Sequence, residues 1–396
     1  MPLSLPVRLR LAMVALALAA GGIALAAPGQ GAPGQVAPAP RPNSPQTYFG
    51  VQLDSGRDTV DGYAARLGQT PALYGFYVDF PFQPADLSFL DAQAHELAQR
   101  RSSLMLTLEP RGGLGAVTPP ALAELTRSLQ AWNNLGVPVL VRFGQEMNGA
   151  WYPWGQKPAQ YIEKFREVAA AVHSSPGSGT VWAPNEGGGY PFDGGDYEAK
   201  PGTADFAALD TDKDGRLTQK DDPYSPYWPG DDAVDWVGLS VYHFGAAYPW
   251  GKNTVPEPGK LIGKITGTYR SASVDESAVP DFYADYAEGH NKPFAICETG
   301  AFYNLSRSDG ASALSIKKAW WDQLFDPQLR ARFPRLRLAV WFEWIKQENQ
   351  PGTPTVDWVA NSDGPVGDAF RRALPSSFGM APLESPPDAA FARPRP

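Results

Sequence analysis

The chain has 396 residues, of which 43% are hydrophobic and 19% are charged, so it can build a sizeable core in one large domain or two ordinary ones. A formal net charge of −8 argues against nucleic acid or an anionic membrane surface as a partner. The single cysteine, Cys297, excludes an intrachain disulfide and a thiolate metal cluster.

The N-terminus has the pattern of a targeting segment. Arg8 and Arg10 precede an apolar stretch at 11–27, and Ala24-Leu25-Ala26 fits a cleavage site. We therefore expect residues 1–27 to be a signal peptide, with an uncleaved anchor as the alternative. The mature protein is then secreted, to the periplasm or outside the cell, with no further membrane association.

Two segments lack the apolar periodicity of folded elements. Residues 28–46 are rich in Pro, Gly and Ala and are typical of a flexible linker. Residues 375–396 are also Pro-rich, which predicts a disordered tail. One folded domain at 47–374 remains, and we expect it to be monomeric.

Strand-like and helix-like patterns alternate through this domain. Short apolar runs predict eight strands, at 48–53, 72–78, 104–108, 138–143, 180–183, 234–242, 293–297 and 336–341. Amphipathic patterns predict helices at 60–67, 86–101, 119–135, 158–173, 276–288, 311–324 and 366–374. This order predicts a single (β/α)8 barrel, also called a TIM barrel.

Chemistry in such barrels lies at the carboxyl ends of the strands. Polar side chains gather at these positions: Asp54, Asp79, Glu109, Gln145, Glu146, Asn185, Tyr242, His243, Glu298 and Glu343.

The stretch at 137–155 carries the strongest signal. A buried strand ends at Glu146, and Trp151, Tyr152 and Trp154 follow within eight residues. A carboxyl group can act as acid or base, and flat aromatic rings stack on sugar faces. The alternative is a strand end capped by polar groups, followed by a loop of core aromatics.

The seventh strand supplies a second carboxylate, Glu298. Strands four and seven lie opposite each other, so Glu146 and Glu298 can face one another across a substrate. Two carboxylates about 5–5.5 Å apart are typical of a retaining glycosidase. Because side chains alternate along a strand, we expect Cys297 to point towards the helices while Glu298 points inward.

Other polar groups compete for these roles. Asn185-Glu186 has the pattern of an acid/base pair, but Asn185 closes strand five and Glu146 closes strand four. Glu109 and Glu343 also end strands, and we expect them to support the site or bind substrate. His243 is the one histidine expected to border the pocket.

The segment between strands five and six, 186–232, is unusually long and is interpreted as a binding insertion. Within it, residues 210–221 match an EF-hand loop, with Gly215 at the turn and Leu217 as an apolar plug. Aspartate replaces the usual glutamate at its last position. We expect a structural Ca2+ ion here, with an exposed acidic turn as the alternative; its predicted ligands are Asp210, Asp212, Asp214, the Arg216 carbonyl and Asp221.

Four segments resemble glycoside hydrolase family 26, a retaining barrel family of β-mannanases and related endo-β-glycanases. They are the acid/base signature at 142–155, the strand at 234–242, the nucleophile strand at 293–300, and 339–342 with Lys346, Glu348 and Asp357-Trp358 downstream.

The resemblance implies roles for particular residues. It implies Glu146 as acid/base and Glu298 as nucleophile, with no catalytic cofactor. The other implied site residues are Arg142, which would hold the carboxylates, Gln145, Tyr242 beside the nucleophile, and Trp151, Trp154 and Trp341 in substrate binding. Gln145 stands where the family usually has histidine, which leaves the substrate and the pH profile open.

The predicted activity is retaining endo-hydrolysis of a β-linked polysaccharide, with β-mannan the commonest substrate of the family. Mixed-linkage β-glucan, β-xylan and the cell's own exopolysaccharide are alternatives. A non-catalytic glycan-binding protein on a degenerate barrel is a further alternative. An esterase or lyase lacks support, because no nucleophile elbow with a triad is apparent.

Overall fold

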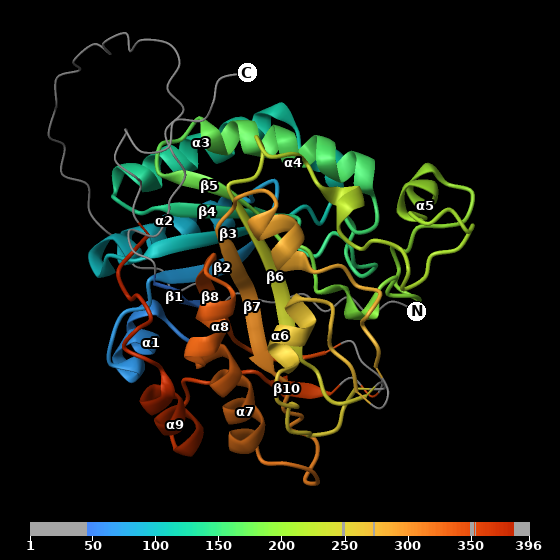
Figure 1. The fold of residues 1–396 in the computed structure, drawn as a ribbon. Coiled ribbons are helices and arrows are strands. Elements are labelled where there is room, and N and C mark those ends of the chain that lie inside the picture. The colour runs from blue at the N-terminus through green and yellow to red at the C-terminus, as the bar shows by residue number, and fades with distance from the viewer. Residues whose placement is uncertain (1–45, 248–249, 272–273, 349–351, 353, 384–396) are drawn as a thin grey trace, which may run out of the picture. The chain divides into compact units, whose positions relative to one another are not determined.

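The computed structural model describes residues 46–247, 250–271, 274–348, 352 and 354–383. Eight parallel strands, β1 to β8, form a closed barrel in which each strand pairs with the next and β8 pairs with β1 (Figure 1). The strands are β1 Tyr48–Leu53, β2 Leu73–Asp79, β3 Ser103–Glu109, β4 Val139–Phe143, β5 Ser178–Trp182, β6 Trp236–His243, β7 Phe294–Ala301 and β8 Leu336–Glu343. The predicted (β/α)8 fold is confirmed.

Alternation along the strands divides the core into two layers. Val139 and Val141 of β4 point outward and join the large cluster between the barrel and the helices. Leu140 points inward and joins a smaller cluster with Met105 and Val181 that fills the barrel. Every residue of β4 is buried, because an all-parallel sheet is covered on both faces.

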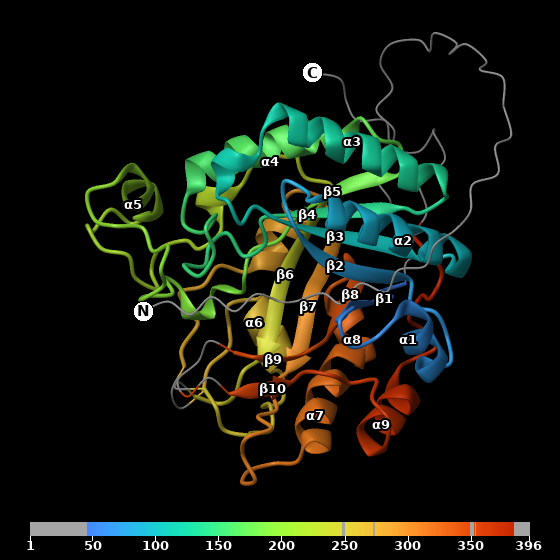
Figure 2. The same ribbon diagram turned by 180° about the vertical axis from the view of Figure 1, so that it is seen from behind.

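Helices surround the barrel (Figures 1 and 2). On α2, three apolar residues spaced at helical intervals, Leu90, Ala94 and Leu97, are the buried positions. The α-helices are α1 Val60–Leu67, α2 Pro84–Arg100, α3 Pro119–Asn134, α4 Pro158–His173, α5 Ala204–Leu209, α6 Lys260–Ile265, α7 Ala313–Phe325, α8 Pro327–Arg332 and α9 Pro365–Ala373.

The helix predicted at 276–288 is mostly wrong. Only Tyr283–Glu288 is helical, as a single π-helical turn, and the regular helix of this connection is α6, earlier in the chain. Pro280 explains the difference, because it lacks an N–H group and disfavours helical backbone at the residue before it.

The connection between β5 and β6 contains two short 3-10 turns, Gly187–Gly189 and Ser225–Tyr227, and the short helix α5. α5 and the loop after it stand away from the barrel in both ribbon views (Figures 1 and 2). Leu209 is fully buried, and Leu217 packs against the core as predicted for an apolar plug.

The folded region extends beyond its predicted end. Phe378 and Leu383 are buried, and Gly379 exchanges backbone hydrogen bonds with Thr47 and Phe49. The prediction of a disordered tail is therefore wrong for residues 375–383, which pack against the first strand; the rest of that segment lies outside the described residues. The predicted signal peptide and nearly all of the linker lie outside the described residues.

A two-stranded antiparallel hairpin follows β8, formed by β9 Ile345–Gln347 and β10 Thr355–Asp357.

Among the residues that the structure describes, none of the helices has the length and apolar character needed to cross a membrane.

Candidate active site

Glu298 lies in the carboxyl-terminal half of β7 and is held by side chains from three other strands. The guanidinium of Arg142 on β4 pairs with one carboxylate oxygen, and the hydroxyl of Tyr242 on β6 donates to the other at 2.7 Å. The Tyr77 hydroxyl on β2 also hydrogen-bonds to this carboxylate. Arg142 is fully buried and donates a second bond, 2.7 Å long, to the hydroxyl of Ser240.

These contacts set the charge of Glu298. Burial by itself would raise the pKa of Glu298, but the Arg142 charge and the three hydrogen bonds lower it below its ordinary value. Glu298 is therefore ionised at neutral pH. A buried carboxylate with a fixed cation and no need to take up a proton is suited to act as a nucleophile.

Glu146 lies three residues beyond the end of β4, in a left-handed backbone conformation with φ of 56°. Its two carboxylate oxygens accept hydrogen bonds from the Asn185 amide at 2.9 Å and from the Trp151 indole N–H at 3.0 Å. Burial raises the pKa of Glu146, and the negative charge of Glu298 raises it further. The two carboxylates thus have pKa values shifted in opposite directions, as an acid and a nucleophile require.

Glu298 points inward as predicted, but the prediction for Cys297 is wrong. Leu239 pairs with Ile296 and the next residue, Ser240, pairs with Glu298, so Cys297 is the extra residue of a bulge. Its side chain joins the cluster inside the barrel, where its sulfur would lie 2.4 Å from a Cβ on Gly238. The bulge breaks the alternation on which the prediction relied.

Gln145 is buried and belongs to a polar chain that runs to the surface. Its side-chain amide donates to Glu109 at 2.7 Å, and Glu109 accepts a 2.6 Å bond from Arg111. Arg111 in turn pairs with Asp79 at 3.1 Å. Burial raises the pKa of Glu109, which Arg111 and Gln145 partly offset. Glu109 therefore supports the site through Gln145.

The aromatic loop after Glu146 has one residue at the site and one in the core. Trp151 is half-buried and contacts Glu146 directly. Trp154 is fully buried, donates its indole N–H to the Gln145 carbonyl, and stacks under Tyr152 at 4.4 Å between ring centroids. The prediction that Trp154 binds substrate is wrong, because its ring faces are covered by protein.

Trp341 is also in the core. It is fully buried, packs against Trp321 of α7 and Phe370 of α9, and donates to the Trp358 carbonyl. The prediction of a sugar platform at Trp341 is wrong, because this position of β8 points outward. The neighbouring positions, Phe342 and Trp344, are the ones that contact the site aromatics.

Two other strand-end groups lie away from the carboxylate pair. Glu343 accepts bonds from the backbone of Ala360 and Asn361, and burial raises its pKa to about 7. The Nε2 of His243 donates to the Thr254 carbonyl at 2.8 Å, and its ring lies beside Trp320, so it does not border the pocket as expected. Burial lowers the pKa of His243 to about 4. Both side chains point toward the helices.

Glu186 is tied into a buried ionic cluster. The Lys264 ammonium lies 2.7 Å from Glu186 and 2.8 Å from Glu276, and burial with the neighbouring Glu186 charge raises the pKa of Glu276 to about 8. Glu186 also caps the short turn that follows it. It has no free oxygen directed at the carboxylate pair, whereas its neighbour Asn185 does contact Glu146.

Tyr77 and Ser240 also contact the site, although neither was predicted from the sequence. Tyr77 stands two positions before Asp79 on β2, so alternation places both on one face, and this signal could have identified it. Ser240 has the same relation to Tyr242 on β6. Tyrosine and serine occur in many strands. They can be assigned to the site only from their spacing to Asp79 and Tyr242.

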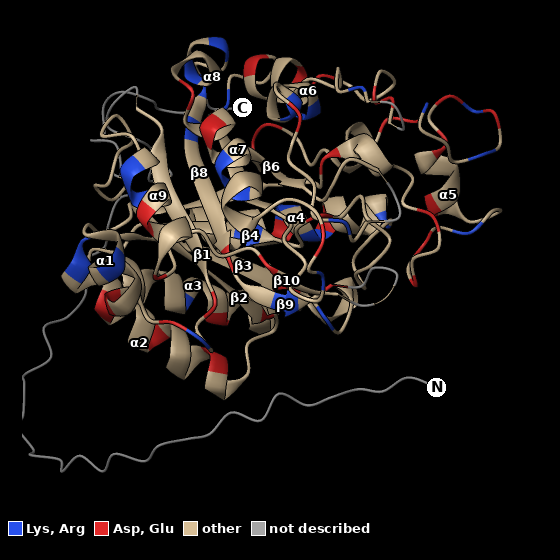
Figure 3. Cartoon of the chain, turned by 90° about the horizontal axis from the view of Figure 1, so that it is seen from below, with Lys and Arg blue, Asp and Glu red and all other residues tan. Residues whose placement is uncertain are grey.

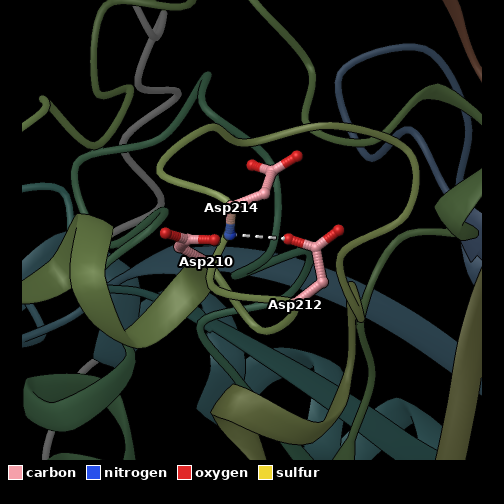
Figure 4. A group of neighbouring side chains, drawn as sticks. All are labelled: Asp210, Asp212 and Asp214. Atoms are coloured by element: carbon pink, nitrogen blue, oxygen red, sulfur yellow. Dashed lines mark hydrogen bonds between the residues drawn. The ribbon is translucent and has the colours of Figure 1, made fainter.

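The loop at 210–221 brings three carboxylates together (Figure 4). Oxygens of Asp210, Asp212 and Asp214 lie within 4.8 Å of one another. One oxygen of Asp210 accepts from the Gly215 amide, and the other is shielded from solvent without a hydrogen-bond partner among the described residues. Figure 3 shows both acidic and basic residues along the loop after α5. Three oxygen donors around a turn fit a hard cation such as Ca2+.

Asp221 does not join this group. One of its oxygens accepts from the Thr211 backbone at 2.6 Å and the other from the Thr218 backbone at 2.8 Å. The shorter aspartate side chain thus closes the loop by capping its backbone. Asp221 was predicted as a ligand, but in the structure both of its carboxylate oxygens are bound to the loop backbone instead.

Comparisons with known proteins agree with this geometry. A model of glycosyl hydrolase family 26 matches residues 110–174, which include Arg142, Glu146 and Trp151. Endoglucanase H of Acetivibrio thermocellus is 22% identical over 298 residues, a match that covers 73% of this chain. The chain spans only 26% of the length of that relative.

Solved structures share the fold. A modular endo-β-1,4-mannanase from Cellulomonas fimi superposes with a TM-score of 0.53 at 16% identity, covering 88% of this chain and 76% of the other. A double mutant of the Cellulomonas fimi endo-β-1,4-mannanase gives a TM-score of 0.50 at 16% identity, covering 85% and 72%.

The closed barrel and the matched segment are similar to those of glycoside hydrolases. The matched model is that of glycosyl hydrolase family 26, so the resemblance predicted from the sequence is confirmed.

Proposed function

We propose that this protein is a retaining endo-β-glycosidase, with Glu298 as nucleophile and Glu146 as acid/base. The observation that carries the proposal is the different surroundings of two buried carboxylates. Glu298 pairs with the Arg142 guanidinium and accepts from Tyr242, which lowers its pKa and keeps it ionised. Glu146 accepts only from the uncharged donors Asn185 and Trp151, and burial raises its pKa. β-Mannan is the first candidate substrate, because the solved relatives named above are described as endo-β-1,4-mannanases.

In the first step the Glu298 carboxylate attacks the anomeric carbon, and the bond to the leaving sugar oxygen breaks. Glu146 gives its proton to that oxygen, so the leaving group departs as a neutral alcohol. Arg142 and Tyr242 fix both oxygens of Glu298 and orient the carboxylate for attack. The product is a covalent glycosyl-enzyme and an ionised Glu146.

In the second step the ionised Glu146 takes a proton from a water molecule, and the oxygen of that water attacks the anomeric carbon. The bond to Glu298 breaks and the carboxylate is released. Two inversions leave the anomeric configuration unchanged. The donors from Asn185 and Trp151 stabilise the ionised Glu146 that exists between the two steps.

Two expectations from the sequence remain part of this proposal. The first is secretion, which rests on the N-terminal pattern at 1–27. The second is a structural Ca2+ ion held by Asp210, Asp212 and Asp214, with the Arg216 carbonyl as a further ligand. The ion would order the loop and takes no part in the proposed chemistry.

The test is an activity panel on the purified protein with calcium present. The substrates are β-mannan, mixed-linkage glucan, xylan and β-1,3-glucan, and proton NMR follows the anomeric signal of fresh product. Oligosaccharides with retained configuration from one polymer are the expected result. Inverted configuration would remove Glu298 as nucleophile, and binding without hydrolysis of any polymer would favour a glycan-binding protein.

A further inference from the structure

The long connection after β5 packs directly behind the loop that carries Glu146. The Tyr197 amide donates to the Ala150 carbonyl at 3.0 Å. Gly195 lies so close that a Cβ there would be 2.3 Å from the same carbonyl oxygen. The backbone of the connection therefore touches the backbone of the acid/base loop without intervening side chains.

Gln156 joins the same two segments through its side chain. Its amide donates to the Pro191 carbonyl at 2.8 Å, and its oxygen accepts from the Ala199 amide at 2.8 Å. Its own backbone N–H donates to the Met147 carbonyl, also at 2.8 Å. Gln156 is buried with φ of 51°, so one residue in a left-handed conformation ties both sides together.

Phe192 brings this connection to the acid/base residue. Its ring meets the Trp151 indole edge to face, with 4.9 Å between centroids and 78° between planes. Phe192 also packs over Gly189, where a Cβ would lie 2.9 Å from the ring. Phe192 itself has φ of 59°, a conformation that a bulky residue adopts only when its surroundings impose it.

Trp151 is thus confined from two directions. Its six-membered ring folds over Gly149, where a Cβ would lie 2.3 Å away, and Phe192 presses from the insertion. In this position its indole N–H reaches Glu146 at 3.0 Å. A rotation of the indole away from Phe192 would remove that hydrogen bond.

We infer that Phe192 is a positioning residue that holds the Trp151 indole N–H on Glu146. The inference rests on the proposed acid/base role of Glu146. It assigns the long connection a part in proton transfer to the leaving sugar. Phe192 acts through Trp151 and need not touch substrate itself.

The test compares two substrates on Phe192→Ala. One is the polysaccharide that the wild-type protein cleaves, and the other is the dinitrophenyl β-glycoside of the same sugar, whose leaving group needs no proton. We expect kcat/KM for the polysaccharide to fall about threefold to tenfold, the size of one aromatic pair, while kcat/KM for the aryl glycoside stays unchanged. The alkaline limb of the pH profile of kcat/KM for the polysaccharide moves to higher pH. The reason is that loss of the Trp151 hydrogen bond to the ionised carboxylate raises the pKa of Glu146.

Two further variants control the comparison. Phe192→Tyr keeps the ring and restores the wild-type values. Phe206→Ala removes another aromatic of the same connection, on α5, and leaves both substrates unaffected. If Phe192→Ala loses its cooperative melting transition, Phe192→Leu gives the same comparison with the apolar volume kept and the ring removed.

Three outcomes would overturn the positioning role while leaving the proposed function intact. Phe192→Ala could lower kcat/KM equally for both substrates, or for neither. Phe206→Ala could lower kcat/KM for the polysaccharide as much as Phe192→Ala does. A wild-type protein that hydrolyses neither substrate would overturn the proposed function, and the positioning role with it.

Discussion

The two carboxylates of the site are held in different ways. Glu298 is held by the barrel itself, with partners on β2, β4 and β6 and a guanidinium as its counter-charge. Glu146 lies beyond the end of its strand, and its donors, Asn185 and Trp151, come from loops and carry no charge.

The difference matches the roles proposed for the two groups. A nucleophile has to stay ionised and aligned, and a rigid sheet with a buried arginine provides both. An acid/base group has to gain and lose a proton in every turnover, so a fixed cation beside it would be a disadvantage. Burial and uncharged donors leave Glu146 free to change its charge.

The largest expected effect separates the two carboxylates. Glu298→Gln and Glu146→Gln each lower polysaccharide hydrolysis at least about 100-fold, a size typical of positioned acid–base groups. Glu146→Gln retains formation of the glycosyl-enzyme from a dinitrophenyl glycoside, whereas Glu298→Gln loses it. Burst kinetics measure that step.

Binding of the polymer to both variants, followed by calorimetry, serves as the folding control. A variant at either position that keeps more than about one hundredth of the wild-type rate would show that the carboxylate is not one of the pair.

The next largest effect is expected from a substitution beside Glu298, the carboxylate that the barrel strands hold. Tyr242→Phe removes a hydrogen bond to an ionised carboxylate, so the pKa of Glu298 rises and the acid limb of kcat/KM moves to higher pH, by about one unit. The rate at the pH optimum falls about tenfold. An acid limb that stays in place while the alkaline limb moves would assign the residues the other way round.

A smaller effect is expected from a substitution beside Glu146, the carboxylate whose hydrogen-bond donors come from loops. Asn185→Ala removes a donor to Glu146, which raises the pKa of Glu146 and moves the alkaline limb up by about half a unit. The pH profile of kcat/KM measures this, with Tyr242→Phe as the matched variant for the other limb. If both limbs move together in either variant, the two environments are not independent.

The smallest effect concerns the loop at 210–221, for which a Ca2+ ion is proposed. Chelation lowers the melting temperature by about 4 °C, as expected for a site saturated at about 100 times its Kd in a domain of this size. Activity well below the melting temperature stays unchanged. Asp212→Asn removes the response to chelator, and a melt that ignores both chelator and this substitution would exclude the ion.

Much of the fold could be predicted from local pattern. Two helices, α1 and α4, and the strand β1 lie at their predicted residues, because caps, apolar periods and prolines act over a few residues. The connection between β6 and β7 was predicted poorly. There, an ionic cluster and Pro280 decide the backbone, and neither has a periodic signal.

The site divides in a similar way. The positions of Glu146 and Glu298 at strand ends follow from the sequence, and the structure brings them within electrostatic influence of each other. Which aromatics face the substrate does not follow. Trp341 and Trp154 are chemically suited to bind sugars, yet both are fully buried by packing against neighbouring elements.

The sequence by itself determined the barrel, the two strand-end glutamates and the acidic loop, because each depends on residue type and short spacing. Only the tertiary structure decided which way side chains point at the ends of strands. The bulge at Cys297 turns two successive residues inward, and register between distant strands brings Tyr77 to Glu298. Such effects depend on pairing between segments far apart in the chain, which local spacing does not encode.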